Sequence, residues 1–325
     1  MKKALKKFLN AYWLRPETAL WRTLDVESMN GFEFVSPSLD MGCGDGTFSF
    51  LRAEGEFDKT FDVFQNVDNI EQFFNNVDVY DSYSDSYKAS IKKCAKYQID
   101  FGLDHKTNLL MKAKKTGLYK NIIVADANKK LPFESEFFQT VFSNIIYWLN
   151  DPYAVFSELN RVLKPKGKCC IMLPNISYLE SSFYYQYYLM GGQKSQFDFL
   201  KLIDRGRIQD NLKIVRKRKE WEEMIGEAGF EIISCVPHLS KTLIQIWDIG
   251  LRPIFPLLKK MTQNIELNKL MEIKEEWVNV FEKIGYPIIE NDDLLLQGCE
   301  HTFLLYRKFR LFEAQKRNIC SSNIR

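Results

Sequence analysis

The stretch that most constrains the fold is residues 39–50, LDMGCGDGTFSF, where three alternating glycines follow an apolar segment that ends at Asp40. Such glycines indicate a tight turn between a strand and a helix, because glycine adopts backbone conformations that other residues avoid. The spacing excludes two common nucleotide motifs. A dinucleotide-binding G-x-G-x-x-G would need glycine where Thr47 stands, and a P-loop would need a lysine after Gly46.

Beyond this turn, apolar segments alternate with segments of helical periodicity. Residues 32–44 read as a strand that runs into the glycine turn, and a Pro–Gly stop over 163–168 is expected to close one of the helices. The other predicted strands are 99–104, 121–127, 140–145, 169–174, 231–237 and 302–309, and the predicted helices are 106–116, 151–162 and 219–230. This alternation predicts an α/β fold: a doubly wound, mostly parallel sheet with helices on both faces.

The rest of the chain is assigned to additions around this core. We expect an N-terminal helical segment at 1–30 and one domain at 31–309, with largely helical insertions at about 54–98, 176–212 and 241–297. The basic residues 310–325 are predicted to form a disordered tail.

Composition narrows the function classes. The 325 residues carry a net charge of only +3, which gives no overall electrostatic footprint of a dedicated nucleic-acid binder. Seven cysteines without a C-x-x-C pair indicate free thiols in a reducing compartment, so we expect a cytoplasmic protein. No apolar run reaches the ~18 residues that a membrane-spanning helix needs.

Polar residues stand where successive predicted strands end: Asp40 with the glycines, Asp104, Asp126 with Ala127, and Ser143–Asn144. In an open parallel sheet, ligands bind beyond these carboxyl ends. The glycine turn suits a carboxylate or phosphate, Asp104 suits the two hydroxyls of a ribose, and Asp126 suits an exocyclic amine. Carboxylate, ribose and adenine together describe S-adenosylmethionine.

The chain resembles the class I S-adenosylmethionine-dependent methyltransferases of small-molecule type, through four stretches that occur in the order typical of that family. They are LDMGCGDG, GLDHK, VADANKKLPFESEFFQTVFSN and ELNRVLKPKGKCCIMLP. The resemblance implies a Rossmann-like, seven-stranded sheet whose last strand is antiparallel. It also implies S-adenosylmethionine as methyl donor and no metal.

The resemblance implies these contacts with the donor. Gly42, Cys43 and Gly44 would line its methionine part with Asp40 nearby and Asn144 close by, Asp104 would bind the ribose, His105 would lie against the adenine, and Asp126 with Ala127 would contact the adenine edge. One departure is the long separation of Gly46 from Asp104, which requires the intervening insertion to loop out, over the active site.

The sequence says less about which residues contact the methyl acceptor. Many small-molecule members carry a histidine where this chain has Trp148, which cannot act as a base. Tyr147 is therefore our candidate catalytic, acceptor-facing group; the alternative is that both aromatic residues pack beneath the donor. His238 and His301 read as isolated histidines that lack a third metal ligand.

Two missing motifs favour a small-molecule acceptor, such as a sugar, a lipid-linked glycan or a secondary metabolite. No D/N-P-P-Y follows Ser143–Asn144, and no Pro-Cys dipeptide occurs. A nucleic-acid methyltransferase that uses the basic residues 216–219 and a non-catalytic cofactor-binding or scaffold protein remain alternatives. The bulky segment 243–260 reads either as a lid or core helix or as a peripheral membrane contact. The oligomeric state is left open.

Overall fold

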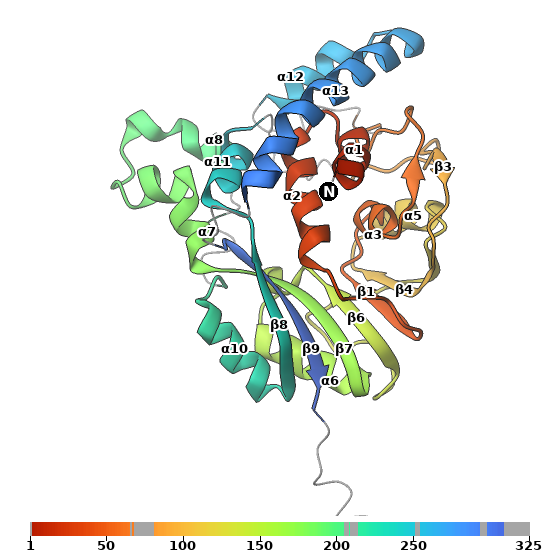
Figure 1. Cartoon of the computed structure of the whole chain (residues 1–325), viewed down its shortest axis with the longest axis vertical. Helices are drawn as coiled ribbons and strands as arrows, with labels where there is room; N and C mark the ends of the chain where they lie inside the picture. Colours follow the sequence, from red (N-terminus) through yellow and green to blue (C-terminus); the bar gives the residue numbers. More distant parts are fainter. Residues whose placement is uncertain are drawn as a thin grey trace, which may run out of the picture.

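The structure is a computed structural model that describes residues 2–65, 67, 81–204, 208, 214–250, 254–292 and 298–308. The predicted tail at 310–325 lies outside the described residues. Figure 1 shows a central twisted sheet with helices gathered at one end of its strands.

The sheet has seven strands in the order β5-β4-β1-β6-β7-β9-β8. β9 runs antiparallel to both of its neighbours, whereas β1 pairs in parallel with β4 and β6. The prediction of a mostly parallel, seven-stranded sheet with an antiparallel last strand is therefore confirmed. The bounds are β1 Ser38–Met41, β4 Ile99–Asp104, β5 Tyr119–Val124, β6 Phe138–Ser143, β7 Leu163–Pro174, β8 Phe230–His238 and β9 Glu300–Arg307.

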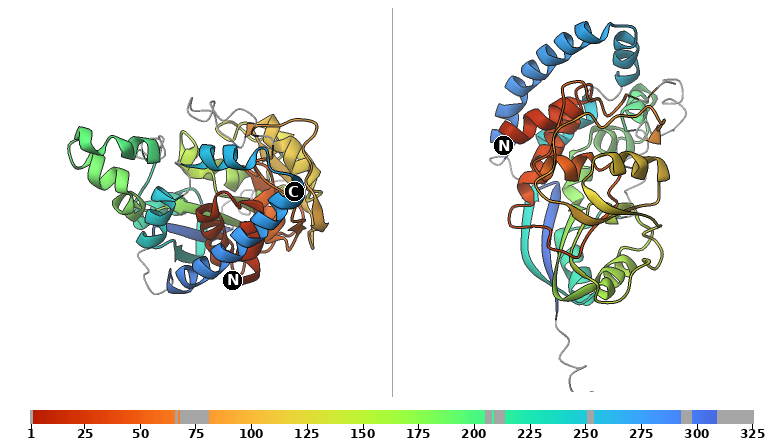
Figure 2. Two further views of the ribbon diagram at one scale, coloured as in Figure 1. Left: turned by 90° about the horizontal axis from the view of Figure 1, so that it is seen from above. Right: turned by 90° about the vertical axis from the view of Figure 1, so that its right-hand side faces the viewer.

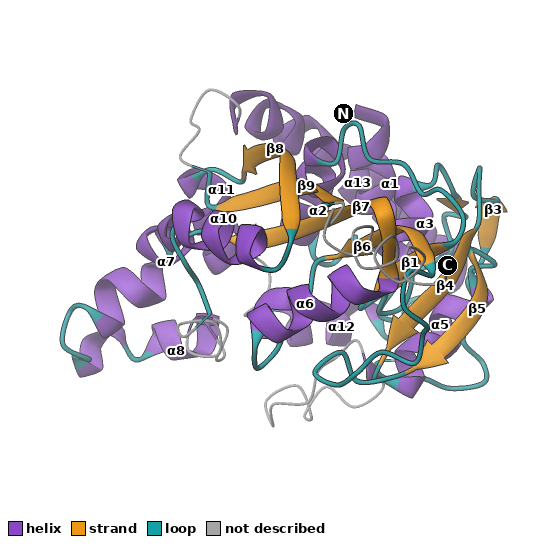
Figure 3. Cartoon of the chain, turned by 90° about the horizontal axis from the view of Figure 1, so that it is seen from below, coloured by secondary structure: helices purple, strands orange, loops and turns teal. Residues whose placement is uncertain are grey.

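Both faces of the sheet are covered. α6 (Pro152–Val162) and α10 (Arg218–Glu227) lie on one side of the strands, and α2 (Pro16–Ser28) and α3 (Thr47–Arg52) on the other (Figure 3). α5 (Thr107–Lys115) packs against β4 and β5. In β7, Ile171 joins the core on the α6 side while Met172 joins the opposite one. A strand buried on both faces reads as one continuous apolar run, and here it is CCIMLP.

Two predicted boundaries were wrong. β1 begins at Ser38, not at Phe32, because Pro37 has no N–H group to donate to a neighbouring strand. The Pro–Gly segment 163–168 belongs to β7, whose pairing with β6 is irregular between the pairs Phe138–Leu163 and Thr140–Lys168. The turn residues therefore lie within the strand, where its pairing with β6 is interrupted.

A helical layer covers the end of the sheet at which the parallel strands finish (Figure 1). We call α1 (Lys2–Ala11), α2, α11 (Lys241–Ile249) and α13 (Leu267–Asp292) the helical cap. α1 packs against α2 and α13, and α13 lies across α1 (Figure 2). The indole N–H of Trp277 donates to the carbonyl of Trp13 at 2.6 Å, which joins the last helix to the first two.

The remaining elements belong to the insertions. β2 (Glu56–Phe57) and β3 (Ile91–Lys93) form a separate antiparallel pair in the first insertion. Its residues 81–87 lie beside α5, where Lys115 Nζ donates to the carbonyl of Tyr87 at 2.8 Å. α7 (Ile176–Ser181), a π-helical turn at Tyr184–Leu189, a short turn at Ser195–Phe197 and α8 (Phe199–Asp204) form the second insertion, and α12 (Phe255–Thr262) belongs to the third. Within the described ranges, no helix is both long and apolar enough to span a membrane.

Candidate functional site

The glycine turn connects β1 to α3 and is fixed to the end of β4. The amides of Gly42 and Cys43 both donate to the carbonyl of Leu103, at 2.7 and 3.0 Å. Gly42, Gly44 and Gly46 have φ of +82°, +55° and +76°, a region that favours glycine. A Cβ on Gly42 would meet Ile145 at 2.5 Å, whereas a Cβ on Gly44 would meet nothing within 4 Å. The turn is therefore closed behind Gly42 and open above Gly44.

Asp104, at the end of β4, holds the open part of this turn. Its carboxylate accepts hydrogen bonds from the amides of Gly44 at 3.0 Å and Lys106 at 2.9 Å. The residue is only 8% exposed. His105 next to it is largely exposed, with its Nδ1 3.4 Å from Asp104 Oδ1. A buried carboxylate that faces an open glycine turn can accept hydrogen bonds from paired hydroxyls, as predicted for a ribose.

Asp40 lies deeper than its neighbours. It is 2% exposed, and its Oδ2 accepts hydrogen bonds from Ser49 Oγ at 2.5 Å and from the Tyr119 hydroxyl at 2.6 Å. Burial raises the pKa of Asp40 to about 6, although these hydrogen bonds oppose the shift. Its carboxylate therefore ties β1 to α3 and β5, and a direct contact with a ligand stays a prediction.

The other predicted donor residues sit on the same edge of the sheet. Asp126 and Ala127 follow β5, and Asn144 follows β6. Asp126 is half-buried and accepts from Asn128, while Ala127 is buried. Burial raises the pKa of the Cys43 thiol well above its usual value, so the thiol stays protonated and Cys43 contributes backbone rather than charge. Four adjacent strands thus bring the predicted residues to one edge; their contacts with a ligand stay predictions.

Tyr147 and Trp148 lie in a short 3₁₀ turn at Ile146–Trp148, just after β6, with their rings 4.8 Å apart. Trp148 is 57% exposed, so it does not pack into the interior. Burial, followed by the charge of Glu300, raises the pKa of Tyr147 well above its usual value. Its phenol is therefore neutral at pH 7 and suits hydrogen-bond donation rather than proton removal.

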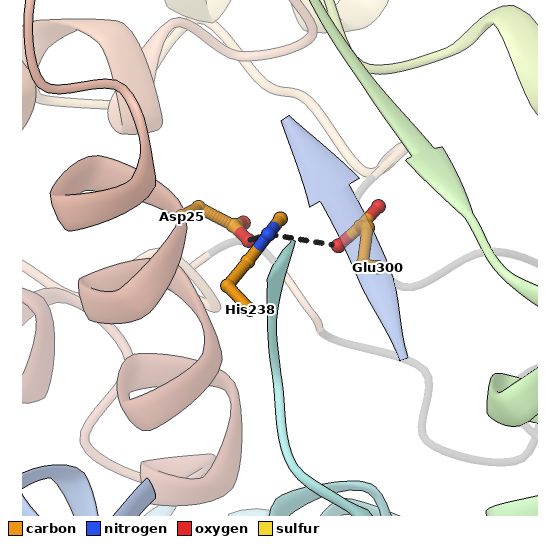
Figure 4. Close-up of side chains that lie close together, drawn as sticks. All are labelled: Asp25, His238 and Glu300. Carbon is orange, nitrogen blue, oxygen red and sulfur yellow. Dashed lines mark hydrogen bonds and ion pairs between the residues drawn. The ribbon is translucent and has the colours of Figure 1, made fainter. Parts of the chain in front are cut away.

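The structure also assembles a polar cluster that the sequence did not reveal. Asp25 of α2, His238 at the end of β8 and Glu300 at the start of β9 point toward one another (Figure 4). His238 Nε2 lies 3.3 Å from Asp25 Oδ1 and 3.4 Å from Glu300 Oε2. We call these three side chains the Asp25–His238–Glu300 cluster.

This cluster corrects the interpretation of His238 as an isolated histidine. His238 pairs in register with Glu300 across two antiparallel strands, a pairing that sequence spacing alone could not reveal because 61 residues separate the two strands. His301 follows Glu300 in β9 and so points to the other side of the strand, away from the cluster. Burial lowers the pKa of His301 to about 4, as expected for a packed histidine.

Charge within the cluster is balanced by its neighbours. Arg22 Nη1 donates to Asp25 Oδ2 at 2.7 Å. Burial alone would lower the pKa of His238, but its contacts with Asp25 and Glu300 outweigh burial and raise that pKa to about 9. Burial raises the pKa of Glu300, and His238 opposes this shift. Tyr147 is near enough to this cluster for its charges to act on the phenol: after burial, Glu300 raises the pKa of Tyr147 and Arg22 lowers it.

Comparison with known proteins identifies the class of domain. Residues 88–171 match a family model described as a methyltransferase domain. The match runs from the end of the first insertion into β7 and includes Asp104, Asp126 and Asn144. Together with the seven-stranded sheet, it confirms the resemblance to class I S-adenosylmethionine-dependent methyltransferases. No curated protein matches the sequence significantly.

Solved structures of related architecture are remote. A possible histamine N-methyltransferase from Thermotoga maritima has 14% identity and a TM-score of 0.41, over 69% of this chain and 77% of that one. A putative methyltransferase from Haloferax volcanii, solved with its Trm112 activator, has 13% identity and a TM-score of 0.46, over 90% and 92%.

Proposed function

We propose that this protein transfers the methyl group of S-adenosylmethionine to a small-molecule acceptor. The observation that carries the proposal is the pairing of an open glycine turn with a buried carboxylate. Gly44 has free space above it, and Asp104 lies beside it at the carboxyl edge of the sheet. This is the edge at which α/β sheets of this kind bind their ligands.

The residues present suit this donor. The open side of Gly44 admits a ligand next to the backbone, and Asp104 retains acceptor capacity for ribose hydroxyls. The donor supplies a methyl group on a sulfonium, which is a good leaving group. The task of the protein is then to align the acceptor with that methyl group and to exclude water. Tyr147, neutral and near the end of β6, is our candidate for orienting the acceptor by hydrogen bonding.

Two observations support a small acceptor. The net charge of +3 provides no broad basic surface for nucleic acid. The helical cap also lies over the carboxyl ends of β8 and β7, through the contacts of α2 with β8 and of α11 with α7. A cap of this kind limits the size of what can reach the donor. The proposed acceptors are a sugar hydroxyl, a lipid-linked glycan or a secondary metabolite.

The donor site is tested by calorimetric titration with S-adenosylmethionine and S-adenosylhomocysteine. We expect dissociation constants of about 10 µM or below, equivalent to about 7 kcal/mol. Asp104→Ala should abolish binding, whereas Glu134→Ala, which removes an exposed carboxylate at the opposite edge of the sheet, should leave it unchanged. Absence of binding to the wild-type chain would contradict the proposal.

Acceptor class is tested by transfer of a labelled methyl group to sugars, lipid-linked saccharides and transfer RNA. Incorporation into a saccharide supports the proposal. Incorporation into RNA alone would favour the nucleic-acid alternative, and donor binding without any transfer would favour a cofactor-binding protein.

A further inference from the structure

The Asp25–His238–Glu300 cluster is not used by the proposed transfer of a methyl group. Its three side chains come from α2, β8 and β9 and turn toward a common point (Figure 4). One ligand atom from each side chain lies within 4.8 Å of the other two. Side-chain exposure is 0% for Asp25, 5% for His238 and 7% for Glu300. Burying an imidazole and two carboxylates together is energetically costly unless the charged groups are paired with one another or bind a metal ion.

The distances fit ligands around an ion better than hydrogen bonds. Charge-assisted N–H···O bonds are about 2.7–2.9 Å long. His238 Nε2 instead stands 3.3 and 3.4 Å from the two carboxylate oxygens. Ligands at the roughly 2.1 Å bond length of zinc are separated from one another by about 3.0–3.4 Å in octahedral or tetrahedral geometry. The two separations from His238 Nε2 fall at the upper end of that range, and the two carboxylate oxygens lie within 4.8 Å of each other.

One of the proposed ligand atoms also lacks a hydrogen bond. Glu300 Oε2 is buried and has no hydrogen-bond partner of good geometry within the described part of the chain. Arg22 occupies Oδ2 of Asp25, which orients the carboxylate so that Oδ1 faces His238. A hydrogen bond to the outer oxygen of a carboxylate is the usual support for a metal-ligating carboxylate.

We propose that Asp25 Oδ1, His238 Nε2 and Glu300 Oε2 bind one divalent transition-metal ion, of the Zn²⁺ or Mn²⁺ class. One nitrogen and two oxygen ligands suit these ions better than thiol-preferring ones. Three protein ligands leave at least one coordination position free, as in catalytic rather than structural sites. The cluster is separate from the predicted donor residues, so its test is independent of the proposed function.

The experiment uses the full chain freed of metal by dialysis against a chelator. Zn²⁺ and Co²⁺ are titrated separately, and retained metal is measured by emission spectroscopy after gel filtration. Co²⁺ also reports ligand type, since thiolate ligands give an intense charge-transfer band that nitrogen and oxygen ligands do not. We expect one equivalent of metal and no thiolate band.

Matched variants locate the site. His238→Gln and Glu300→Gln should each lower the metal affinity by about tenfold or more. Glu231→Gln, which changes an exposed carboxylate on β8, and His301→Gln, on the other side of β9, should retain one equivalent. Circular dichroism and calorimetric titration of the methyl donor show whether each variant is folded.

The outcomes are decisive in both directions. One equivalent that is lost only in the cluster variants supports the site. No retained metal in the wild-type chain, or equal retention in all variants, would overturn it and leave a charge-balanced network of buried ion pairs. Donor binding in a chain that retains no metal would overturn this inference alone, whereas metal retention without donor binding would overturn only the proposed function.

Discussion

Gly42 and Gly44 stand two residues apart but face different surroundings. Behind Gly42 lies the side chain of Ile145, and above Gly44 there is open space. Both have positive φ, so an alanine at either position carries a backbone cost of about 1–2 kcal/mol. Only at Gly42 does the added methyl group also collide with the protein.

We therefore predict that Gly42→Ala mainly lowers stability, whereas Gly44→Ala mainly lowers donor affinity. Gly42→Ala should lower the free energy of unfolding by about 2–5 kcal/mol, because overpacking adds to the backbone cost. Gly44→Ala should cost only about 1–2 kcal/mol in stability but more than about tenfold in donor affinity, because its methyl group enters the space meant for the ligand. Urea unfolding and calorimetric titration measure the two quantities. Equal donor affinity in Gly44→Ala and wild type would place the ligand elsewhere.

Asp40 gives a prediction about pH. Its pKa rises from 3.8 to about 6 in the folded chain, so between these values the folded state binds more protons than the unfolded state. The free energy of unfolding should therefore fall as pH rises from about 4 to 6, by about 3 kcal/mol at most from this group. Asp40→Asn should remove this component.

The measurement is urea unfolding of wild type and Asp40→Asn at steps from pH 4 to pH 7. The difference between the two should change with pH and level off above about pH 6. A difference that stays constant over that interval would show that Asp40 ionises normally in the folded chain.

At the scale of elements, α12 packs against the protein on one side and is exposed to solvent on the other. Phe255 packs on Phe64 with ring centroids 4.6 Å apart, and Lys259 Nζ donates to the carbonyl of Phe64 at 2.8 Å. Leu257 and Met261 are 58% and 65% exposed. The packed face of α12 thus fits the core-helix interpretation, and the membrane contact of its exposed face stays a prediction.

We predict that the exposed face of α12 binds anionic lipid vesicles. Apolar side chains next to lysines are typical of interfacial helices. Co-sedimentation with phosphatidylglycerol vesicles should decrease strongly in the double variant Leu257→Ser, Met261→Ser. Gln263→Ser, which changes an exposed polar residue next to the same helix, should bind like wild type. Binding that the double variant retains in full would exclude this face as the contact.

The sequence predicted the sheet well because its strands are apolar runs that end in polar residues. Asp104 and Ser143 close β4 and β6 as expected. Sequence-based prediction failed for features that depend on which distant segments pair in three dimensions. The β2–β3 pair has only a few residues in each strand, too few for a recognisable alternation. The Asp25–His238–Glu300 cluster joins Asp25 to residues more than 200 positions away. The register of β8 with β9 pairs His238 with Glu300, and the packing of α2 against β8 adds Asp25.

At the scale of the whole molecule, the N-terminal helices are part of the core rather than an appendage. Leu5 and Phe8 of α1, Phe50 of α3 and Ile289 of α13 belong to one buried apolar cluster. Ser28 at the end of α2 lies 2.6 Å, hydroxyl to hydroxyl, from Thr302 of β9. The ends of the described chain are thus joined through the sheet.

We therefore predict a single cooperative unfolding transition for the whole chain. Calorimetric and van't Hoff enthalpies should agree, and donor binding should raise the midpoint without splitting it. A chain that lacks residues 1–30 should fail to fold, because it would expose the apolar cluster that α1 and α2 cover. Two separate transitions, or a soluble truncated chain that still binds the donor, would show that the helical cap is an independent unit. In that case the cap could open without unfolding the sheet, and access to the donor edge would be governed by its movement.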